Sequence, residues 1–350
     1  MDFNSLDSTS LDSLQTYEVI DSNPYHIKKV YTQANNTINS QDFQTNIEST
    51  KTTQSQPIDY IIFLDSDDYL DHACIQSCIE SNINNQAQII FYEDAYIFDG
   101  IEKQTLYTWQ ETCGFKKATF ITPSIWLDKT IQTKADYFGV TRGVVIDFNF
   151  LQTIKLKFLN GIYHEDILFG VILFMQAKNI LILPNKYYYY RLRAGSICNY
   201  GSIAVKIPFY LEKILPYFNG STKLVSQYNL ASSWALIALH TLEFLQNFAD
   251  KELAQSFEKA FMPFYAKQFL LLFECRADPL NLRPKFPLLL PYLENTPLSF
   301  YERILAFHPL LRPIAVKIHH FYLWQKDLER RFRWWRKGRK VKCKLGKAAK

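Results

Sequence analysis

Glycine is scarce and unevenly placed in this sequence. It occurs 11 times in 350 residues, and the first is Gly100. The amino-terminal part of the chain therefore contains neither a GxGxxG turn nor a P-loop, the glycine-rich motifs that hold phosphate groups through backbone amides. If this part binds a phosphate-containing ligand, a metal ion held by carboxylates is the remaining way to neutralise the phosphate charge.

Cysteine pairs and long apolar segments are also missing. The six cysteines are scattered without a CxxC pair, which fits reduced thiols in a cytoplasm better than a disulfide framework or a zinc site. The start, MDFNSLDSTS, has neither the basic nor the apolar region of a signal peptide, so none is expected. The longest apolar stretch, around Ile167 to Met175, has nine residues, whereas a membrane-spanning helix needs about 20. The sequence predicts a chain that does not cross a membrane.

Acidic and basic residues are separated along the chain. From Lys317 onward there are 13 Lys or Arg and two acids, a local balance of +11. Because the whole chain carries +5, residues 1–316 carry −6. An acidic body with a cationic tail is not typical of a nucleic-acid-binding protein, so no nucleic-acid partner is expected.

The apolar pattern changes near residue 205. Between Asp59 and about Ile197, apolar stretches of strand length alternate with helical patterns, which is typical of an α/β sheet domain. Strands are predicted at Glu18–Ile20, Ile27–Tyr31, Tyr60–Leu64, Gln88–Tyr92, Asn179–Leu183 and Tyr187–Tyr190. Helices broken by prolines are predicted at Tyr228–Phe248, Lys251–Ala277 and Phe300–Lys337. The predicted divisions are a partly disordered segment over residues 1–56, the sheet domain over 57–204, a helical region over 205–315 and a basic tail over 316–350.

The most informative motif is IIFLDSDDYL, residues 61–70. An apolar run of strand length ends in three carboxylates, Asp65, Asp67 and Asp68. Two carboxylates about 4 Å apart repel by about 4 kcal/mol at an effective dielectric of roughly 20, and Mg2+ or Mn2+ relieves that repulsion. The alternative is that Ser66 or Asp68 caps a helix predicted over residues 69–84. Capping needs one acid rather than three, so the motif favours a metal site at the carboxyl end of a strand, where open α/β sheets bind ligands.

A second acidic element, YHED at residues 163–166, precedes the apolar helix that contains Ile167. One interpretation is helix capping, because each acid in a first turn gains about 0.3–1 kcal/mol from the helix dipole. The other is a general base, a carboxylate at a helix start facing a cleft. His164 has no second histidine at metal-ligand spacing, so a packing role is favoured for it.

A third element, YYYYRLRAGSI at residues 187–197, ends a predicted strand with two arginines. Arg191 and Arg193 occupy alternate positions, so their side chains point to the same side of the strand. Arginine fits phosphate in a bidentate geometry, which favours an anion-binding role. The alternative is a solvated pair at the end of the strand.

Taken in order, FLDSDD, then YHEDILF about one hundred residues later, then YYYRLRAGSI, the chain resembles family 2 glycosyltransferases of the GT-A fold over roughly residues 58 to 197. The resemblance implies metal-dependent, inverting transfer of a hexosyl or N-acetylhexosaminyl group from a nucleotide-diphosphate sugar, with a UDP-sugar as the expected donor. The implied cofactor is Mn2+ or Mg2+. The implied acceptor is a hydroxyl of a surface glycan, such as lipopolysaccharide, lipooligosaccharide or capsule, or of its lipid-linked precursor.

The resemblance also implies roles for individual residues. Asp67, assisted by Asp65, would hold the metal, and Asp166, beside Glu165, would deprotonate the acceptor hydroxyl. The donor-binding set would be Asp65, Asp67, Asp68, Arg191, Arg193 and Asp21. The acceptor-side set would be Trp126 and His164. The first strand of the family is missing here, and Tyr17 to Ser22, which includes Asp21, looks like a reduced form of its second. An inactive transferase remnant that binds a membrane surface is therefore the alternative function.

The basic tail has an amphipathic pattern. Ile314, Ile318, Phe321, Leu328, Phe332 and Trp335 fall on one helix face, with basic residues around it. The predicted membrane-surface residues are Phe321, Arg330, Arg331, Phe332, Arg333, Trp334, Trp335 and Arg336. A basic helix rich in Trp and Phe lies flat on an anionic membrane, which predicts a peripheral protein on the cytoplasmic face of the inner membrane. The alternative is a packed terminal helix with a solvated basic end.

Overall fold

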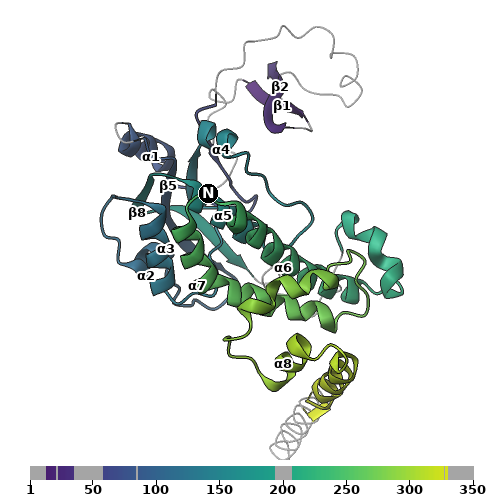
Figure 1. The fold of residues 1–350 in the computed structure, drawn as a ribbon. Coiled ribbons are helices and arrows are strands. Elements are labelled where there is room, and N and C mark those ends of the chain that lie inside the picture. The colour runs from purple at the N-terminus through teal and green to yellow at the C-terminus, as the bar shows by residue number, and fades with distance from the viewer. Residues whose placement is uncertain are drawn as a thin grey trace, which may run out of the picture.

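The computed structural model describes residues 13–20, 23–34, 58–83, 86–193, 207–326 and 328–329. Within these residues the chain is a mixed α/β sheet followed by a helical carboxyl-terminal region (Figure 1). The α/β class and the change to helices are therefore confirmed. No helix in the described part is both long enough and apolar enough to cross a membrane.

The main sheet has six strands, and its centre is the parallel pair β5 (Ile89–Asp99) and β8 (Ile180–Arg193). The order is β3-β7-β5-β8-β4, and β6 (Thr119–Ile121) also pairs with β8. β3 (Tyr60–Ile62) and β5 flank the antiparallel strand β7 (Val144–Asp147). β4 (Tyr69–Leu70) closes the other edge. In this arrangement the carboxyl ends of β3, β5 and β8 and the start of β7 lie toward the same edge of the sheet.

The remaining elements fall into two groups. Along the sheet domain the helices are α1 (Cys74–Asn82), α2 (Trp109–Cys113), α3 (Pro123–Gln132), α4 (Phe148–Ile154) and α5 (Glu165–Gln176). The carboxyl-terminal region contains η2 (Phe209–Phe218), α6 (Thr222–Asn247), α7 (Lys251–Phe269), η3 (Leu270–Glu274), η4 (Arg283–Tyr292) and α8 (Phe300–Phe307). A helix over residues 312–326 follows. Near the amino terminus, β1 (Ser13–Ile20) and β2 (Asn23–Ala34) form a separate antiparallel hairpin.

Local sequence explains where several helices begin. Thr108 and Glu111 form a reciprocal capping box at α2, and Ser299 and Glu302 form another at α8. Asp250 accepts a hydrogen bond from the Leu253 amide at the start of α7. These caps satisfy amide groups that a helix leaves unpaired in its first turn.

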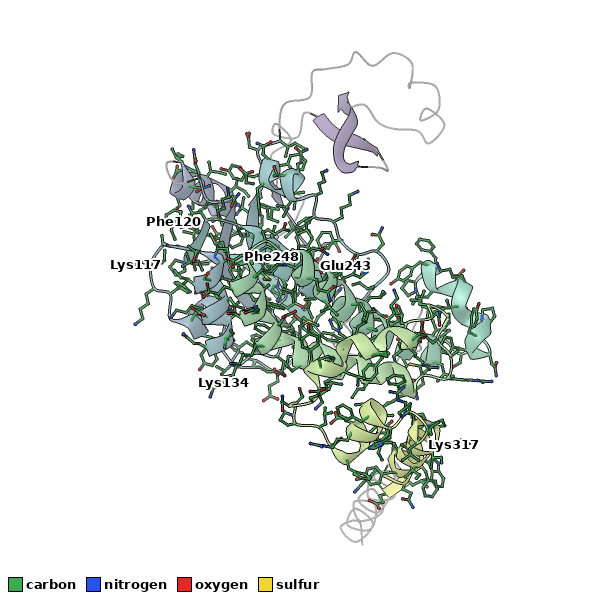
Figure 2. The ribbon with its side chains drawn as sticks, viewed as in Figure 1. Lys117, Phe120, Lys134, Glu243, Phe248 and Lys317 are labelled. Atoms are coloured by element: carbon green, nitrogen blue, oxygen red, sulfur yellow. The ribbon has the colours of Figure 1, made fainter. Side chains whose placement is uncertain are left out.

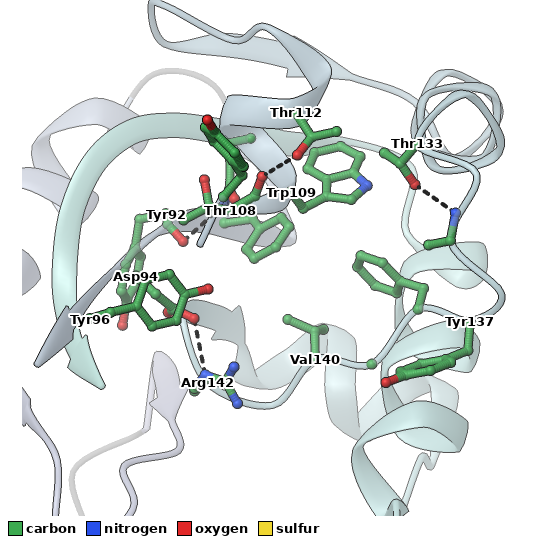
Figure 3. Close-up of a pocket in the computed structure, with 16 residues that line it drawn as sticks. Tyr92, Asp94, Tyr96, Thr108, Trp109, Thr112, Thr133, Tyr137, Val140 and Arg142 are labelled. Atoms are coloured by element: carbon green, nitrogen blue, oxygen red, sulfur yellow. Dashed lines mark hydrogen bonds and ion pairs between the residues drawn. The ribbon is translucent and has the colours of Figure 1, made fainter. Parts of the chain in front are cut away.

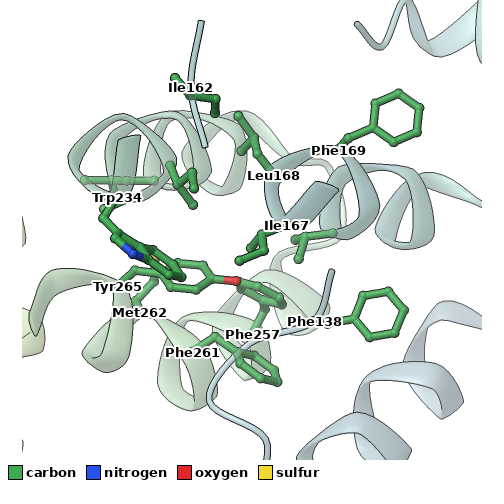
Figure 4. Close-up of a cluster of buried hydrophobic side chains, with 14 of the residues drawn as sticks. Phe138, Ile162, Ile167, Leu168, Phe169, Trp234, Phe257, Phe261, Met262 and Tyr265 are labelled. Atoms are coloured by element: carbon green, nitrogen blue, oxygen red, sulfur yellow. The ribbon is translucent and has the colours of Figure 1, made fainter. Parts of the chain in front are cut away.

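The hydrophobic core continues from the sheet into the helical region. α5 is buried on almost all sides. Its Phe174 lies against Phe91 of β5, with ring centroids 5.4 Å apart. The same buried cluster includes Ile167 of α5 with Trp234 of α6 and Tyr265 of α7 (Figure 4). α5 therefore joins the two regions through shared packing.

The helix predicted over residues 69–84 is wrong in its first part. Tyr69 and Leu70 form β4 and pair with β8, and α1 begins only at Cys74. Asp71 provides the turn between them, because its carboxylate accepts from the Ala73 amide and its carbonyl from the Cys74 amide. Pairing with a long neighbouring strand outweighs local helix propensity here.

Other predicted elements are confirmed in position but differ in extent. β5 continues to Asp99, well past the predicted end at Tyr92, and the two strands predicted around Pro184 are one strand, β8. The predicted strands at Glu18–Ile20 and Ile27–Tyr31 lie within β1 and β2. The single helix predicted from Phe300 is interrupted at residues 308–311, before Pro313. An extended β5 and β8 pairing places the ends of both strands beside the acidic motif.

Candidate functional site

The acidic motif forms a turn directly after β3. The Asp68 amide donates to the Asp65 carbonyl at 3.1 Å, which closes the turn. Asp65 is exposed, whereas Asp67 and Asp68 are half-buried. The three carboxylates therefore lie within one turn but in different environments.

Side chains of β8 hold this turn in place. The Tyr188 hydroxyl donates to Asp68 Oδ2 at 2.8 Å and accepts from the Asp65 amide at 3.2 Å. The Arg191 amide donates to Asp68 Oδ1 at 2.8 Å. Asp68 consequently organises the turn, and α1 has Ala73 as its N-cap residue without a side-chain cap, so the alternative in which Ser66 or Asp68 caps this helix is wrong. Both carboxylate oxygens of Asp68 accept hydrogen bonds within the protein. Its role in donor binding stays a prediction.

The two predicted arginines of β8 contact acidic side chains. Arg193 forms an ion pair with Asp67, with Nη2 and Oδ2 2.9 Å apart. Arg191 Nη1 lies 4.0 Å from Asp99 Oδ2. β8 thus brings Arg193 next to the acidic turn and Arg191 next to Asp99. Residues at alternate positions of a strand point to the same side, which is what the sequence predicted for these two arginines.

Asp166 lies near the acidic turn although about one hundred residues separate them. Asp65 keeps contact with solvent, but its partial desolvation raises its pKa. The negative charges of Asp68, Asp67 and Asp166 raise that pKa further, and the Arg142 guanidinium opposes the rise. Asp65 is therefore influenced by the charges of three other carboxylates, one of them Asp166 of α5, and of one arginine. Such an accumulation of negative charge favours binding of a cation or of a ligand that brings one.

The YHED segment forms the start of α5. His164 has a left-handed backbone conformation with φ 62° and ψ 35°, and its ring packs against Trp234 at a centroid distance of 4.9 Å. Glu165 and Asp166 occupy the first turn of the helix, Glu165 exposed and Asp166 half-buried. Asp166 Oδ2 lies so close to Gly139 that an added Cβ there would be 2.7 Å away.

A pocket of about 380 Å3 lies beside Gly139 and Arg142, and neither the three acids of the turn nor Asp166 is among its lining residues (Figure 3). Gly139 and Arg142 are part of its wall, and they connect it to Asp166 and Asp65 respectively. The aromatic residues of the wall are Phe91, Tyr92, Tyr96, Tyr107, Trp109, Tyr137 and Phe138. Aromatic faces beside a few fixed polar groups are typical of a small-molecule site.

The principal charged groups of this wall are Asp94 and Arg142. Arg142 Nε donates to Asp94 Oδ2 at 3.0 Å, and its guanidinium lies 4.1 Å from the centre of the Tyr190 ring. Burial raises the pKa of Asp94, and Arg142 opposes that rise. This pair is not predicted from the sequence. The sequence has no local signal for it, because Asp94 lies within β5 and its partner is 48 residues away along the chain.

Trp126 does not lie where the sequence predicted. Its side chain is fully buried and packs against Phe138 and Phe174, with ring centroids 5.0 and 5.4 Å away. The acceptor-side assignment of Trp126 is therefore wrong, because a side chain enclosed in the core cannot contact a substrate. Phe138 lines the pocket, and Trp126 packs behind it, away from the pocket.

Several predicted site residues lie outside the described residues. Asp21 is one of them. The others belong to the basic tail and are Arg330, Arg331, Phe332, Arg333, Trp334, Trp335 and Arg336. Phe321 lies within the described part, where 57% of its surface is exposed.

The acidic turn fits a metal ion that arrives with phosphate groups better than a resident one. Among the described residues, no three His, Cys, Asp or Glu side chains are grouped so as to hold a metal. Mg2+, however, is often held by one or two carboxylates together with substrate phosphates. Asp65 and Asp67 would supply those carboxylates, and Asp67 would exchange its contact with Arg193 for the ion.

Comparison with known proteins adds little to this geometry. No family model matches the sequence, and no curated protein shows significant similarity to it. The structure of S. aureus TarS 1–349 in complex with UDP-GlcNAc aligns with 74% of this chain and 63% of that chain, at 15% identity and a TM-score of 0.40. TarS 1–349 alone aligns with 75% and 62% at 15% identity and 0.38, and a longer TarS chain with 78% and 39% at 14% and 0.37. This chain spans less than two thirds of each, and such TM-scores assign neither fold family nor activity.

Proposed function

We propose that this chain is a GT-A-type glycosyltransferase that moves a sugar from a nucleotide-diphosphate sugar to an acceptor hydroxyl. The observation that carries the proposal is that the acidic turn at residues 65–68 (the DSDD turn) and Asp166 lie near one aromatic pocket. These two acidic elements are also two of the three on which the resemblance to family 2 glycosyltransferases rests. A turn of acids alone would indicate a cation site, but a separate carboxylate next to a substrate-sized pocket adds the group that a transfer reaction needs.

In the proposed reaction Asp166 is the general base. The carboxylate removes the proton from the acceptor hydroxyl as that oxygen attacks the anomeric carbon, and a single displacement inverts its configuration. Asp65 and Asp67 would hold Mg2+ or Mn2+, whose positive charge would stabilise the negative charge on the leaving diphosphate. Arg191 and Arg193 lie on the same side and add positive charge for that group.

The aromatic pocket is the proposed acceptor site. Tyr107 and Tyr137 are exposed on its wall and offer flat apolar faces to a sugar ring. The Asp94 and Arg142 pair offers an acceptor and a donor of hydrogen bonds for sugar hydroxyls. The proposed acceptor is a surface glycan or its lipid-linked precursor, which the resemblance implies.

One observation favours the alternative of an inactive remnant. Within the part of the chain that the structure describes, β3 pairs only with β7, and β1 and β2 form a separate two-stranded sheet. A hairpin on its own is marginally stable. A donor site on the open side of β3 would need further residues of the chain to complete it. Measurement of donor binding therefore distinguishes an active transferase from an inactive remnant.

Donor binding is expected to depend on a metal and on Asp67. We expect the full-length protein to bind UDP or a UDP-sugar in calorimetric titrations with Mn2+, and to lose most of that affinity without Mn2+. In Asp67→Ala the Mn2+ dependence should disappear, because one carboxylate ligand is removed. Asp99→Ala is the matched control, since it also removes an acid facing a β8 arginine but lies outside the turn. Absence of binding by folded protein to UDP-, GDP-, CMP- and dTDP-sugars would contradict the proposed function.

We also propose that the protein lies on the cytoplasmic face of the inner membrane, where lipid-linked acceptors are found. The helix over residues 312–326 and its flanks expose large apolar side chains. The helix can be found in Figure 2 by the label of Lys317. Leu310 is 91% exposed and Ile318 64%. The large apolar side chains exposed on this helix and its flanks are Leu310, Leu311, Ile314, Ile318, Phe321, Tyr322, Leu323, Trp324 and Leu328. So many exposed apolar side chains, followed by a strongly basic sequence, favour an anionic bilayer surface as the partner.

Flotation with anionic vesicles tests the membrane proposal. The full-length protein is expected to float with the vesicles, whereas the 1–316 truncation should remain mostly in solution. Ile318→Glu combined with Phe321→Glu keeps the full chain and should reduce flotation because it places charge among the exposed apolar side chains. Equal partitioning of the full-length protein, the truncation and the double variant would contradict the proposal.

A further inference from the structure

The turn before Asp166 has an unusual backbone. His164 adopts the left-handed conformation, which residues other than glycine rarely adopt. Its side chain makes no capping hydrogen bond to α5. Since backbone in this region persists only where surrounding structure holds it, the neighbours of His164 must supply the restraint.

The restraint comes from α6. The Tyr163 amide donates to Ser233 Oγ at 2.8 Å, across 70 residues of sequence. Ser233 is fully buried, and its hydroxyl in turn donates to the Asn229 carbonyl at 2.6 Å, so its orientation is determined. The next residue, Trp234, packs its ring against His164 at 4.9 Å. Consecutive residues of α6 therefore contact consecutive residues of the turn.

α7 supports Trp234 from behind. Phe264 meets the Trp234 ring edge to face at 5.5 Å, and the Tyr265 ring lies 6.3 Å from it. Tyr265 is fully buried, and Figure 4 shows it between Trp234 and Ile167, the residue after Asp166. Trp234 consequently has little freedom to move away from the turn.

Gly139 confines Asp166 from the pocket side. Its missing Cβ leaves room for Asp166 Oδ2, and the Val140 amide donates to the Asp166 carbonyl at 3.2 Å. The base is thus held between a pocket wall and a turn that α6 restrains. Neither contact involves the DSDD turn.

We propose that α6 and α7 position the catalytic base, with Ser233 and Trp234 as positioning residues that hold the His164 turn and so direct Asp166 toward the acceptor. This inference rests on the proposed function and adds a role for the helical region that the sheet domain does not supply. The region acts on the base alone, so loosening it should slow the chemical step and leave donor binding intact. A misplacement of about 1 Å is enough to cost roughly 100-fold in rate.

The test compares Trp234→Leu and Trp234→Phe with the full-length enzyme. Trp234→Leu is expected to lower kcat at least tenfold with the donor KM unchanged, and Trp234→Phe, which keeps an aromatic ring against His164, should recover most of the loss. Ser233→Ala should speed amide hydrogen exchange in the peptide covering residues 162–168, because the Tyr163 amide loses its acceptor. Phe286→Leu is the control, since Phe286 is also buried in the helical region but packs against Phe269 and Phe273.

The outcomes separate this inference from the proposed function. If Trp234→Leu lowers thermal stability about as much as Phe286→Leu while both keep wild-type kcat, the positioning role is overturned. Unchanged hydrogen exchange over residues 162–168 in Ser233→Ala and Trp234→Leu would also overturn it. If instead the wild type transfers no sugar, or Asp166→Asn remains fully active, the proposed function fails, whatever the exchange shows.

Discussion

Asp166→Asn is expected to lower the rate of sugar transfer by about 10²–10⁴-fold, the usual contribution of a general base. The amide has nearly the same shape as the carboxylate but cannot accept the acceptor's proton. Donor affinity should change far less than the rate, because Asp166 belongs to α5 and acts on the proposed donor ligands of the turn after β3 only through its charge. The measurement is initial rate against donor concentration, combined with donor titration.

Glu165→Gln is the matched control for this variant. Glu165 occupies the same helical turn but is exposed, and the charge change is identical. We expect its effect on transfer to be much smaller than that of Asp166→Asn. Comparable losses in the two variants would mean that the charge of the α5 amino terminus matters and that neither carboxylate is the base. Full activity of Asp166→Asn would remove Asp166 from the mechanism.

Gly139→Ala is expected to lower transfer by roughly 100-fold while changing stability little. The new Cβ would lie 2.7 Å from Asp166 Oδ2 and 3.1 Å from Ile167 Cγ1. The carboxylate is the end of a side chain and can rotate away, so the folded state tolerates the methyl group. The rotation moves the base from its position beside the pocket, and a displacement near 1 Å costs about 100-fold in rate. Steady-state kinetics together with thermal unfolding measure both effects.

Gly170→Ala provides the contrast. A Cβ at Gly170 would lie 2.8 Å from the Val140 backbone nitrogen and 3.0 Å from its carbonyl oxygen. Backbone atoms cannot rotate aside, so this variant should lose about 1–3 kcal/mol of stability through overpacking. Its folded fraction should retain more activity than Gly139→Ala. The reverse pattern, in which Gly139→Ala unfolds readily and keeps its rate, would show that Gly139 serves packing and not the base.

The acidic elements could be located from sequence because each has a strong local signal. Three acids directly after an apolar run are unusual, and YHED precedes a helix that is apolar on nearly all sides. The Asp94 and Arg142 pair has no such signal, since an isolated acid and an isolated arginine are common in any sequence. Only the pairing of β5 with β7, and the close approach of Gly143 to Tyr92 and Asp94, brings them together.

Trp126 and Tyr69 are two residues for which the structure contradicts the prediction made from sequence. Trp126 falls on α3 with no periodic signal that distinguishes a buried face from a substrate-facing one, and the structure buries it among Phe138 and Phe174. Tyr69 fits a helical pattern with the isoleucines of α1, yet it pairs with Tyr189 of β8, the two rings stacked 4.6 Å apart. Contacts between distant segments decided the burial of Trp126 and the strand pairing of Tyr69. The pattern of a single sequence could not show either, because it reports only on residues that are close together along the chain.

The sequence by itself determined the α/β class, the helical carboxyl-terminal region and the presence of two acidic elements, because these depend on local composition and periodicity. Only the tertiary structure decided that Asp166 lies near Asp65, that an aromatic pocket lies near both, and that α6 contacts the turn before Asp166. The physical reason is that strand pairing and helix packing join residues far apart along the chain, such as Tyr163 with Ser233, 70 positions away, and Asp68 with Arg191, 123 positions away. A relation of that length leaves no periodic trace in the chain, whereas a strand, a helix or an acidic turn does.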